Sequence, residues 1–223
     1  MTVEMKYFLL LLLAAYCQYS LAQFSNVQKG DVLSINGVKG IVYTVNEDGT
    51  HGTIMSVKAF RGAKNLYCAK ASYLKGLEMS DQTDGKKNTS ALFDYVSANK
   101  IPLFEFPVFN WCNSLGEGWY IPSEEQLKDF VNYWLGNEVE EEDWDDEEAE
   151  DTPAGYSQKK EVNRKLLEAG GTPFLNGVFT STKDDKGKIL VFQYDRKKDF
   201  WQFVHLNPMK IDKECVGRAF YDF

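Results

Sequence analysis

The strongest local signal in the chain is the stretch Pro122-Ser123-Glu124-Glu125-Gln126-Leu127-Lys128-Asp129-Phe130-Val131-Asn132-Tyr133-Trp134-Leu135-Gly136. Ser123 can cap a helix, and Gln126, three residues later, completes a capping box. Apolar side chains then recur at the helical spacing i, i+3, i+4, i+7 and i+8, from Leu127 to Leu135, and form one stripe. Gly136 ends the helix. The stretch therefore predicts an amphipathic helix that buries one face.

Strand patterns lie on both sides of this helix in the sequence. Residues 30–58 read as a three-stranded meander, with turn signals at Asn36-Gly37 and at 46–49. The C-terminal part predicts a strand from Val178, a hairpin of strands 189–194 and 200–206, and a last strand over 216–223. The hairpin carries apolar residues on both faces, which favours burial on two sides. We expect the N-terminal and C-terminal strands to pair within one α+β domain, with helices packed on antiparallel sheets.

Three further helices are expected. The first begins at a Ser90 cap and ends near Asn99, and the second begins at Pro107 and ends at Gly116. The third runs from about Ser157 to Gly170-Gly171. Residues 61–89 are irregular and rich in glycine and polar side chains, so they are expected to be mainly loop.

The N-terminus has the layout of a cleavable signal peptide. Lys6 precedes the short apolar run 7–15, and Ser20-Leu21-Ala22 fits the small-residue cleavage rule. The run is shorter than the roughly 20 residues that span a bilayer. We expect residues 1–22 to be removed on export, leaving a single domain over 23–223; the alternative is a buried helix of the mature fold. No later segment reaches transmembrane length, so no stable membrane insertion is expected after processing.

The acidity of the chain is local. The net charge is −8, yet eleven acidic residues lie between Glu138 and Asp151, and the remaining residues carry a net charge of +3. Such a density of like charge predicts a solvated insertion, at about 138–155, that contributes little to folding. Loose calcium binding is the alternative, although the spacing is not that of an EF-hand. A basic stripe typical of nucleic-acid binding proteins is absent from the sequence.

A series of short motifs, in order along the chain, resembles the exported bacterial Lcl C-terminal-domain family, a domain of unknown function with a C-type-lectin-like fold. The motifs are Gly30-Asp31-Val32, Asn36-Gly37-Val38-Lys39-Gly40, Asp48-Gly49-Thr50-His51-Gly52, Trp111-Cys112-Asn113-Ser114-Leu115-Gly116, Gly118-Trp119-Tyr120-Ile121-Pro122-Ser123, Ala169-Gly170-Gly171-Thr172-Pro173, Phe179-Thr180-Ser181-Thr182 and Gly217-Arg218-Ala219-Phe220. The resemblance covers most of residues 28–223. It implies a C-type-lectin-like α+β fold with two or three packed helices.

The chain departs from that pattern in two ways. Phe179-Thr180-Ser181-Thr182 stands where the family has Trp-Ser-Ser-Thr, and the acidic segment looks like an insertion. The Glu-Pro-Asn and Trp-Asn-Asp motifs with which animal C-type lectins bind calcium and sugar are also absent. The resemblance therefore implies a fold without implying that ligand chemistry.

Processing would leave three cysteines, Cys68, Cys112 and Cys215, and an odd number leaves one thiol over. In lectin-like folds a helix and the closing strand are neighbours, so the resemblance implies a Cys112–Cys215 disulfide with Cys68 left over. The two other pairings and three reduced thiols remain open. The cysteines have no zinc-site spacing, and they offer no nearby pair of the kind that the sulfatase-activating oxidases of the lectin fold need.

Catalytic motifs are missing from the sequence: there is no GxSxG, Walker loop, HExxH or GxGxxG in a strand-to-helix context. His51 falls in a turn and His205 at a strand end, and both are more typical of structural roles. We therefore assign no catalytic, cofactor or metal residues. Tyr194 and Trp201, which flank the hairpin turn, are the candidates for a ligand-binding surface. Trp111, Trp119 and Trp134 are expected in the core.

These features favour an exported, non-catalytic domain that binds a glycan or a protein. The alternative is a structural or assembly component of the cell envelope, with the acidic insertion as its docking surface. An enzyme related to the sulfatase-activating oxidases comes third.

If the N-terminus is a signal peptide, the exported protein should begin near Gln23. N-terminal sequencing of exported material measures this directly. A mature chain that retained Met1 or Met5 would contradict the assignment.

Overall fold

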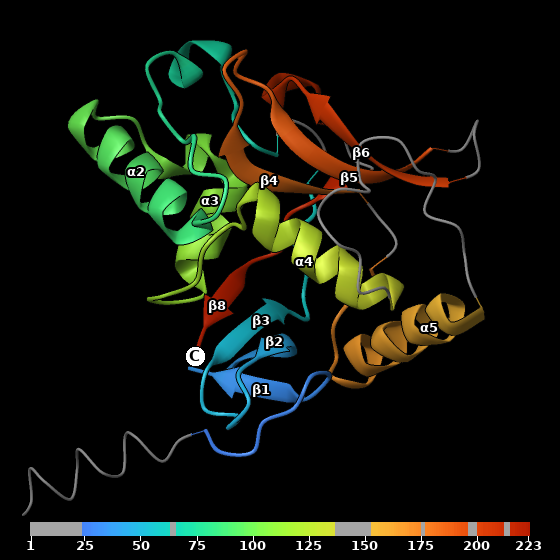
Figure 1. The fold of residues 1–223 in the computed structure, drawn as a ribbon. Helices are drawn as coiled ribbons and strands as arrows, with labels where there is room; N and C mark the ends of the chain where they lie inside the picture. The colour runs from blue at the N-terminus through green and yellow to red at the C-terminus, as the bar shows by residue number, and fades with distance from the viewer. Residues whose placement is uncertain (1–23, 63–65, 137–152, 175–176, 196–199, 212–214) are drawn as a thin grey trace, which may run out of the picture.

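The helix predicted from Pro122 to Gly136 is present as α4 (Glu124–Leu135), and it lies between two sheets (Figure 1). The Ser123 side chain accepts from the backbone N–H of Gln126, the reciprocal half of the capping box is also formed, and Gly136 ends the helix in the left-handed region (φ 71°). Its apolar stripe is buried, and α4 contacts strands β2 (Val38–Val45) and β4 (Gly177–Lys183). The predicted stripe is therefore the central packing face of the molecule.

The computed structural model describes residues 24–62, 66–136, 153–174, 177–195, 200–211 and 215–223. The predicted signal peptide (1–22), the Gln23 start and the acidic stretch Glu138–Asp151 lie outside these residues. Within them, none of the helices is both long and apolar enough to cross a membrane.

The first sheet has the strand order β1-β2-β3-β8 and is antiparallel throughout. Its strands are β1 (Val32–Ile35), β2, β3 (Gly52–Ser56) and β8 (Phe220–Asp222). Asn36 (φ 50°) and Gly37 (φ 83°) form the two-residue turn between β1 and β2, as the Asn-Gly signal predicts. The expected pairing of N-terminal and C-terminal strands is confirmed, because β8 pairs with β3.

The second sheet has the order β6-β5-β4-β7, from β4, β5 (Ile189–Asp195), β6 (Phe200–Leu206) and β7 (Cys215–Val216). The predicted hairpin is present as β5 and β6, with Tyr194 opposite Trp201. Residues 189–192 of β5 are all buried, which confirms burial on two sides for that strand. β7 runs parallel to β4, whereas the other pairs are antiparallel.

The last strand was predicted as one element over 216–223, and this was wrong. The chain forms β7 in the second sheet, then crosses to the first sheet and forms β8. The break falls at 217–219, where Phe60 and Gly217 exchange backbone hydrogen bonds and the N–H of Ser56, at the end of β3, donates to the carbonyl of Ala219. The apolar pattern continues through the crossing, so periodicity alone does not reveal it.

The helix α3 (Pro107–Ser114) begins and ends close to its predicted positions, whereas α2 (Gly85–Ala98) begins six residues and α5 (Pro153–Glu168) about four residues earlier than expected. The cap of α2 is Asp84, not Ser90, and its carboxylate accepts from Lys87 N–H at 2.8 Å. Pro153 is the first residue of α5, a position that its fixed φ suits. The predicted insertion at 138–155 therefore overlaps the first turn of α5. Short 3₁₀ turns also occur: η1 (Ala71–Leu74), η2 (Leu103–Glu105) and η4 (Pro208–Lys210).

A buried arginine stands at the crossing between the sheets. Arg218 is 1% exposed, and its guanidinium donates to the backbone carbonyls of Ser56 (3.0 Å), Val57 (2.8 Å), Thr172 (2.8 Å) and Pro173 (3.2 Å). Burial lowers the pKa of Arg218 to about 9, so the group stays charged at neutral pH. One side chain thus ties the end of β3 to the segment that follows α5.

The architecture confirms the α+β class, with helices packed against antiparallel and mixed sheets. The C-type-lectin-like fold implied by the resemblance stays a prediction. Of the three tryptophans expected in the core, Trp119 and Trp134 are buried, while Trp111 is partly exposed and stacks on Phe60.

Replacing Arg218 by Ala should lower the free energy of unfolding by about 3–5 kcal/mol, because it opens a cavity and leaves buried carbonyl groups without a donor. Arg218→Lys should recover only part of this loss, since one ammonium group cannot reach all four carbonyls. Urea denaturation measures both. Lys58→Ala, at an exposed neighbouring position, is the control and should change stability by less than about 0.5 kcal/mol. A loss below about 1 kcal/mol for Arg218→Ala would show that the crossing does not depend on this group.

Candidate functional site

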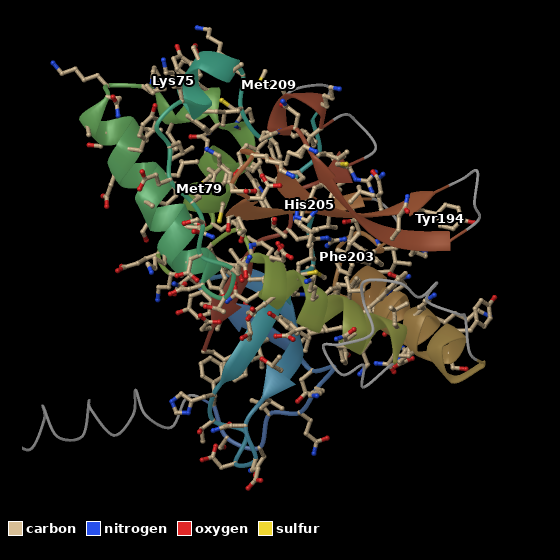
Figure 2. The ribbon with its side chains drawn as sticks, turned by 45° about the horizontal axis from the view of Figure 1, so that its top comes forward. Lys75, Met79, Tyr194, Phe203, His205 and Met209 are labelled. Carbon is tan, nitrogen blue, oxygen red and sulfur yellow. The ribbon has the colours of Figure 1, made fainter. Side chains whose placement is uncertain are left out.

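The two histidines lie apart from each other in the structure. His51 is in the turn before β3, where its Nδ1 is 2.8 Å from the Thr50 hydroxyl. His205 lies on β6, toward the end remote from Tyr194 (Figure 2), and its Nε2 is 4.0 Å from the Glu124 carboxylate.

The hydroxyl-rich run 180–182 on β4 is fully buried and internally bonded. Ser181 donates to the carbonyl of Pro122 (3.0 Å), and Thr180 donates to that of Leu190 (3.2 Å). The amide of Asn88 lies 3.3 Å from the hydroxyls of both Ser181 and Thr182. These hydrogen bonds connect β4 to α2 and to the start of α4, so the hydroxyl groups serve to hold the fold together.

The three cysteines are buried and form no disulfide bond in the structure. Cys68 donates to the carbonyl of Lys70 (3.2 Å), Cys112 lies on the inner face of α3, and Cys215 begins β7. Burial raises the pKa of the Cys68 and Cys112 thiols, which keeps them protonated at neutral pH. The Cys112–Cys215 pairing implied by the resemblance is therefore not seen here and stays a prediction.

In the described part of the chain, no group of three or more His, Cys, Asp or Glu side chains is arranged to hold a metal ion. The acidic stretch for which loose calcium binding was considered lies outside that part.

Tyr194 and Trp201, the predicted surface residues, lie together as a cross-strand pair with ring centroids 5.6 Å apart. Tyr194 is 40% exposed and Trp201 is half-buried. Trp201 stacks on Phe192 at 5.0 Å with an interplanar angle of 15°, and the Trp134 ring meets it edge-on at 5.2 Å. The indole is thus held in place from below by the core.

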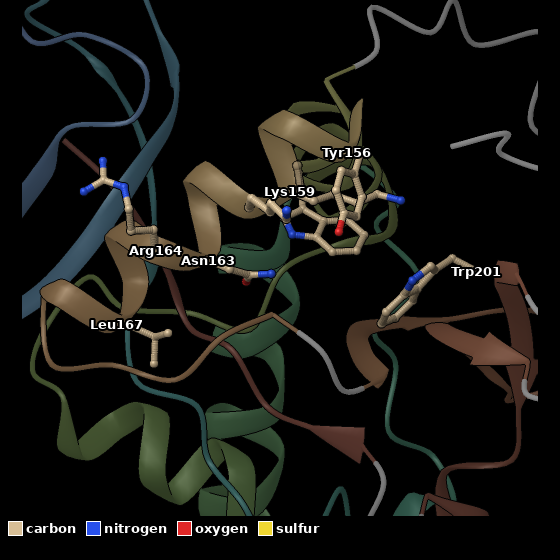
Figure 3. Close-up of a pocket in the computed structure, with 8 residues that line it drawn as sticks. Tyr156, Lys159, Asn163, Arg164, Leu167 and Trp201 are labelled. Carbon is tan, nitrogen blue, oxygen red and sulfur yellow. The ribbon is translucent and has the colours of Figure 1, made fainter. Parts of the chain in front are cut away.

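An open groove of about 500 Å³ runs between Trp201 and α5 (Figure 3). Figure 3 shows Trp201 on one side and Tyr156 and Lys159 of α5 on the other. The lining residues are Trp134, Tyr156, Lys159, Lys160, Asn163, Arg164, Leu167 and Trp201. Tyr156, Lys160, Asn163 and Leu167 follow at i, i+4, i+7 and i+11, so one face of α5 forms the wall.

Exposed apolar side chains gather at this groove. Five large hydrophobic side chains are exposed in the described residues, and two of them, Tyr156 (55%) and Leu167 (56%), line it. A third, Tyr194, contacts Trp201 at its edge. The other two, Val32 and Phe104, lie elsewhere.

Two lysines of the groove lie over aromatic rings. The ammonium of Lys159 lies 5.0 Å from the Trp134 ring centre and that of Lys160 lies 4.3 Å from the Tyr156 ring centre. The oxygen of the Asn163 amide accepts from Phe174 N–H (2.6 Å). The buried indole N–H of Trp134 has no acceptor among the described residues.

The guanidinium of Arg164 is paired with Glu161 (2.6 Å) and Glu168 (2.5 Å) of the same helix. None of the eight lining residues is acidic.

The sequence singled out Trp201 and Tyr194, which lie at this groove, but not the α5 side of it. The signal was present: Val162 and Leu166 form the buried stripe of α5, and Leu167 lies one residue, about 100°, away from it. Tyr156 was placed outside the helix because the predicted start was near Ser157. The earlier start at Pro153 puts Tyr156 and Leu167 on the same face.

Two other cavities are smaller. One of about 430 Å³ lies between the β2–β3 edge, α3 and the end of α5, and includes Lys39, Lys58 and Trp111. Another of about 320 Å³ includes Lys29, Tyr133 and Lys165. Neither cavity is lined by any of the five exposed large hydrophobic side chains, so the groove beside Trp201 is the stronger candidate site.

No family model matches the chain, and comparison with curated proteins and with solved structures also gave no match. The resemblance to the Lcl C-terminal-domain family therefore remains a prediction from the motifs.

The buried thiols should not react with a thiol reagent in the native mature protein at pH 8, since burial keeps them protonated and inaccessible. After unfolding without a reductant, all three cysteines of the structure should titrate. A single reactive thiol in the unfolded protein would instead reveal a disulfide. Peptide mapping would then show whether it joins Cys112 to Cys215.

Proposed function

We propose that the protein is an exported, non-catalytic ligand-binding domain whose ligand, a glycan or a protein, docks in the groove between α5 and Trp201. The observation that carries this proposal is the gathering of exposed apolar side chains at one place. Tyr156 and Leu167 line the groove and Tyr194 borders it. Exposing large apolar side chains to water is unfavourable, so a cluster of them on the surface indicates a binding site.

The rigidity of the aromatic wall supports a binding role. Trp201 is fixed by Phe192 beneath it and by the edge of Trp134. A side chain that is already ordered loses little conformational entropy when a ligand binds, so its contact area contributes more fully to affinity. Large aromatic side chains held in this way are typical of the energetic centres of binding surfaces.

The arrangement of reactive groups also supports binding over catalysis. Catalytic nucleophiles need a base within hydrogen-bond reach. In the described residues, the hydroxyls of β4 are buried in structural hydrogen bonds, and the thiols of Cys68 and Cys112 are buried with raised pKa values. Neither set lines the groove.

The test is a binding screen of the mature protein against a glycan array and a panel of purified envelope proteins. Any saturable ligand should bind Tyr156→Ala about tenfold more weakly, because the ring supplies exposed contact area. Phe104→Ala, which removes a 65% exposed aromatic side chain remote from the groove, is the matched control and should bind normally.

A ligand whose affinity is unchanged by Tyr156→Ala would place the binding surface elsewhere. Binding of an envelope protein that is unaffected by Tyr156→Ala but lost on deletion of residues 140–150 would favour the alternative, an assembly component that docks through its acidic segment.

A further inference from the structure

The pocket between the β2–β3 edge, α3 and the end of α5 has walls that the fold itself holds in place. Its volume of about 430 Å³ falls in the range of small-molecule sites, roughly 300–1,000 Å³. The segment after α5 is held against β3, because Thr172 N–H donates to the Val57 carbonyl (2.9 Å). A Cβ at Gly171 would collide with that same oxygen, so glycine permits the close approach. The pocket is therefore formed before any ligand binds.

Trp111 of α3 supplies a flat apolar wall of this pocket. The indole is partly exposed and stacks on Phe60, with ring centroids 5.7 Å apart and an interplanar angle of 30°. Phe60 is in turn fixed by the two backbone hydrogen bonds that it exchanges with Gly217. A ring that is already ordered loses little conformational entropy when a ligand binds, so its contact area contributes more fully to affinity.

Two lysines line the same pocket. Lys39 and Lys58 are both exposed, and Lys39 Nζ lies 3.4 Å from the carbonyl oxygen of Ala169 at the end of α5. An ammonium group carries three donors, and this carbonyl uses one of them. Neither lysine takes part in the ion pairs formed among the described residues. The pocket therefore offers positive charge to the oxygen acceptors of an anion.

The other side chains of the pocket favour an apolar ligand body over a sugar. Apart from Ser56 they are aliphatic: Val38, Val57, Leu115 and Ala169. The Ser56 hydroxyl donates to the Lys58 carbonyl (2.9 Å) and accepts from Ala219 N–H (3.0 Å), so it is already used. The hydroxyl groups of a sugar would lose hydrogen bonds to water against aliphatic walls, whereas a hydrocarbon ring would lose none.

We infer that this pocket binds a small organic anion that joins an aromatic ring to a carboxylate. The ring packs against Trp111 and the aliphatic side chains, and the carboxylate accepts from Lys39 and Lys58. The pocket and the groove beside Trp201 share no lining residue, so the inference goes beyond the proposed function and does not rest on it.

The experiment adds 2-naphthylacetate, which carries both groups, to the isotopically labelled mature protein and follows the amide chemical shifts. Saturable shift changes should be concentrated at residues 37–39, 56–58 and 169–170, which line the pocket. The concentration dependence of these changes gives the affinity.

Lys39→Ala/Lys58→Ala should weaken binding of 2-naphthylacetate about tenfold, as expected for the loss of two exposed charge pairs. Both side chains are exposed, so the variant should keep its fold. Lys186→Ala/Lys188→Ala removes two exposed lysines from the β4–β5 turn and is the charge-matched control, which should bind as the unaltered protein does.

Changes to the probe separate the apolar and ionic parts without altering the protein. Acetate, which lacks the ring, should bind about tenfold more weakly or worse. The cation 2-(2-naphthyl)ethylamine should also bind more weakly than 2-naphthylacetate, and Lys39→Glu/Lys58→Glu should reverse that preference. The affinity of the anion should fall as salt rises.

Equal weakening by the two lysine pairs, equal binding of acetate, or no saturable binding of 2-naphthylacetate would overturn the inference. Tyr156→Ala, in the groove, should leave the affinity for 2-naphthylacetate unchanged. If this variant instead weakens binding and the shift changes lie on the 156–167 face of α5, the anion occupies the groove. The pocket site then fails while the proposed function stands.

Discussion

The structure depends on the guanidinium of Arg218, which occupies the point where the chain leaves one sheet for the other. Four carbonyl groups from two distant segments, the end of β3 and the residues after α5, accept its hydrogen bonds. Without these donors the carbonyls would be buried and unsatisfied. The same side chain therefore fixes the crossing from β7 to β8 and anchors the C-terminal end of α5.

The anchoring of α5 connects the core to the groove. Phe174, next to the segment held by Arg218, donates to Asn163 of α5 and packs on Trp134 and Phe130. Trp134 in turn supports Trp201. The surface on which a ligand would bind is therefore the outer layer of the aromatic core, and its geometry follows from packing that is needed for folding.

The sequence predicted elements whose signals are local. The capping box at Ser123 and Gln126, the Asn36-Gly37 turn and the hairpin that pairs Tyr194 with Trp201 all occur as expected. It did not predict features set by distant contacts. Gln126 also accepts from Gly85 N–H, and this contact helps to hold the start of α2 earlier than Ser90. The last strand splits where Arg218 bonds to carbonyls of segments distant in the sequence, and the groove depends on how α5 faces β6. Periodicity encodes neither feature.

The most direct test of the account is to locate a bound ligand on the protein. With a ligand from the binding screen added to isotopically labelled mature protein, amide chemical-shift changes should be concentrated on the 156–167 face of α5 and around Trp201 and Tyr194. The β1–β2 turn, on the other sheet, should be unaffected. Shift changes that leave α5 and the β5–β6 hairpin unchanged and cluster elsewhere would contradict the assignment of this groove as the binding site.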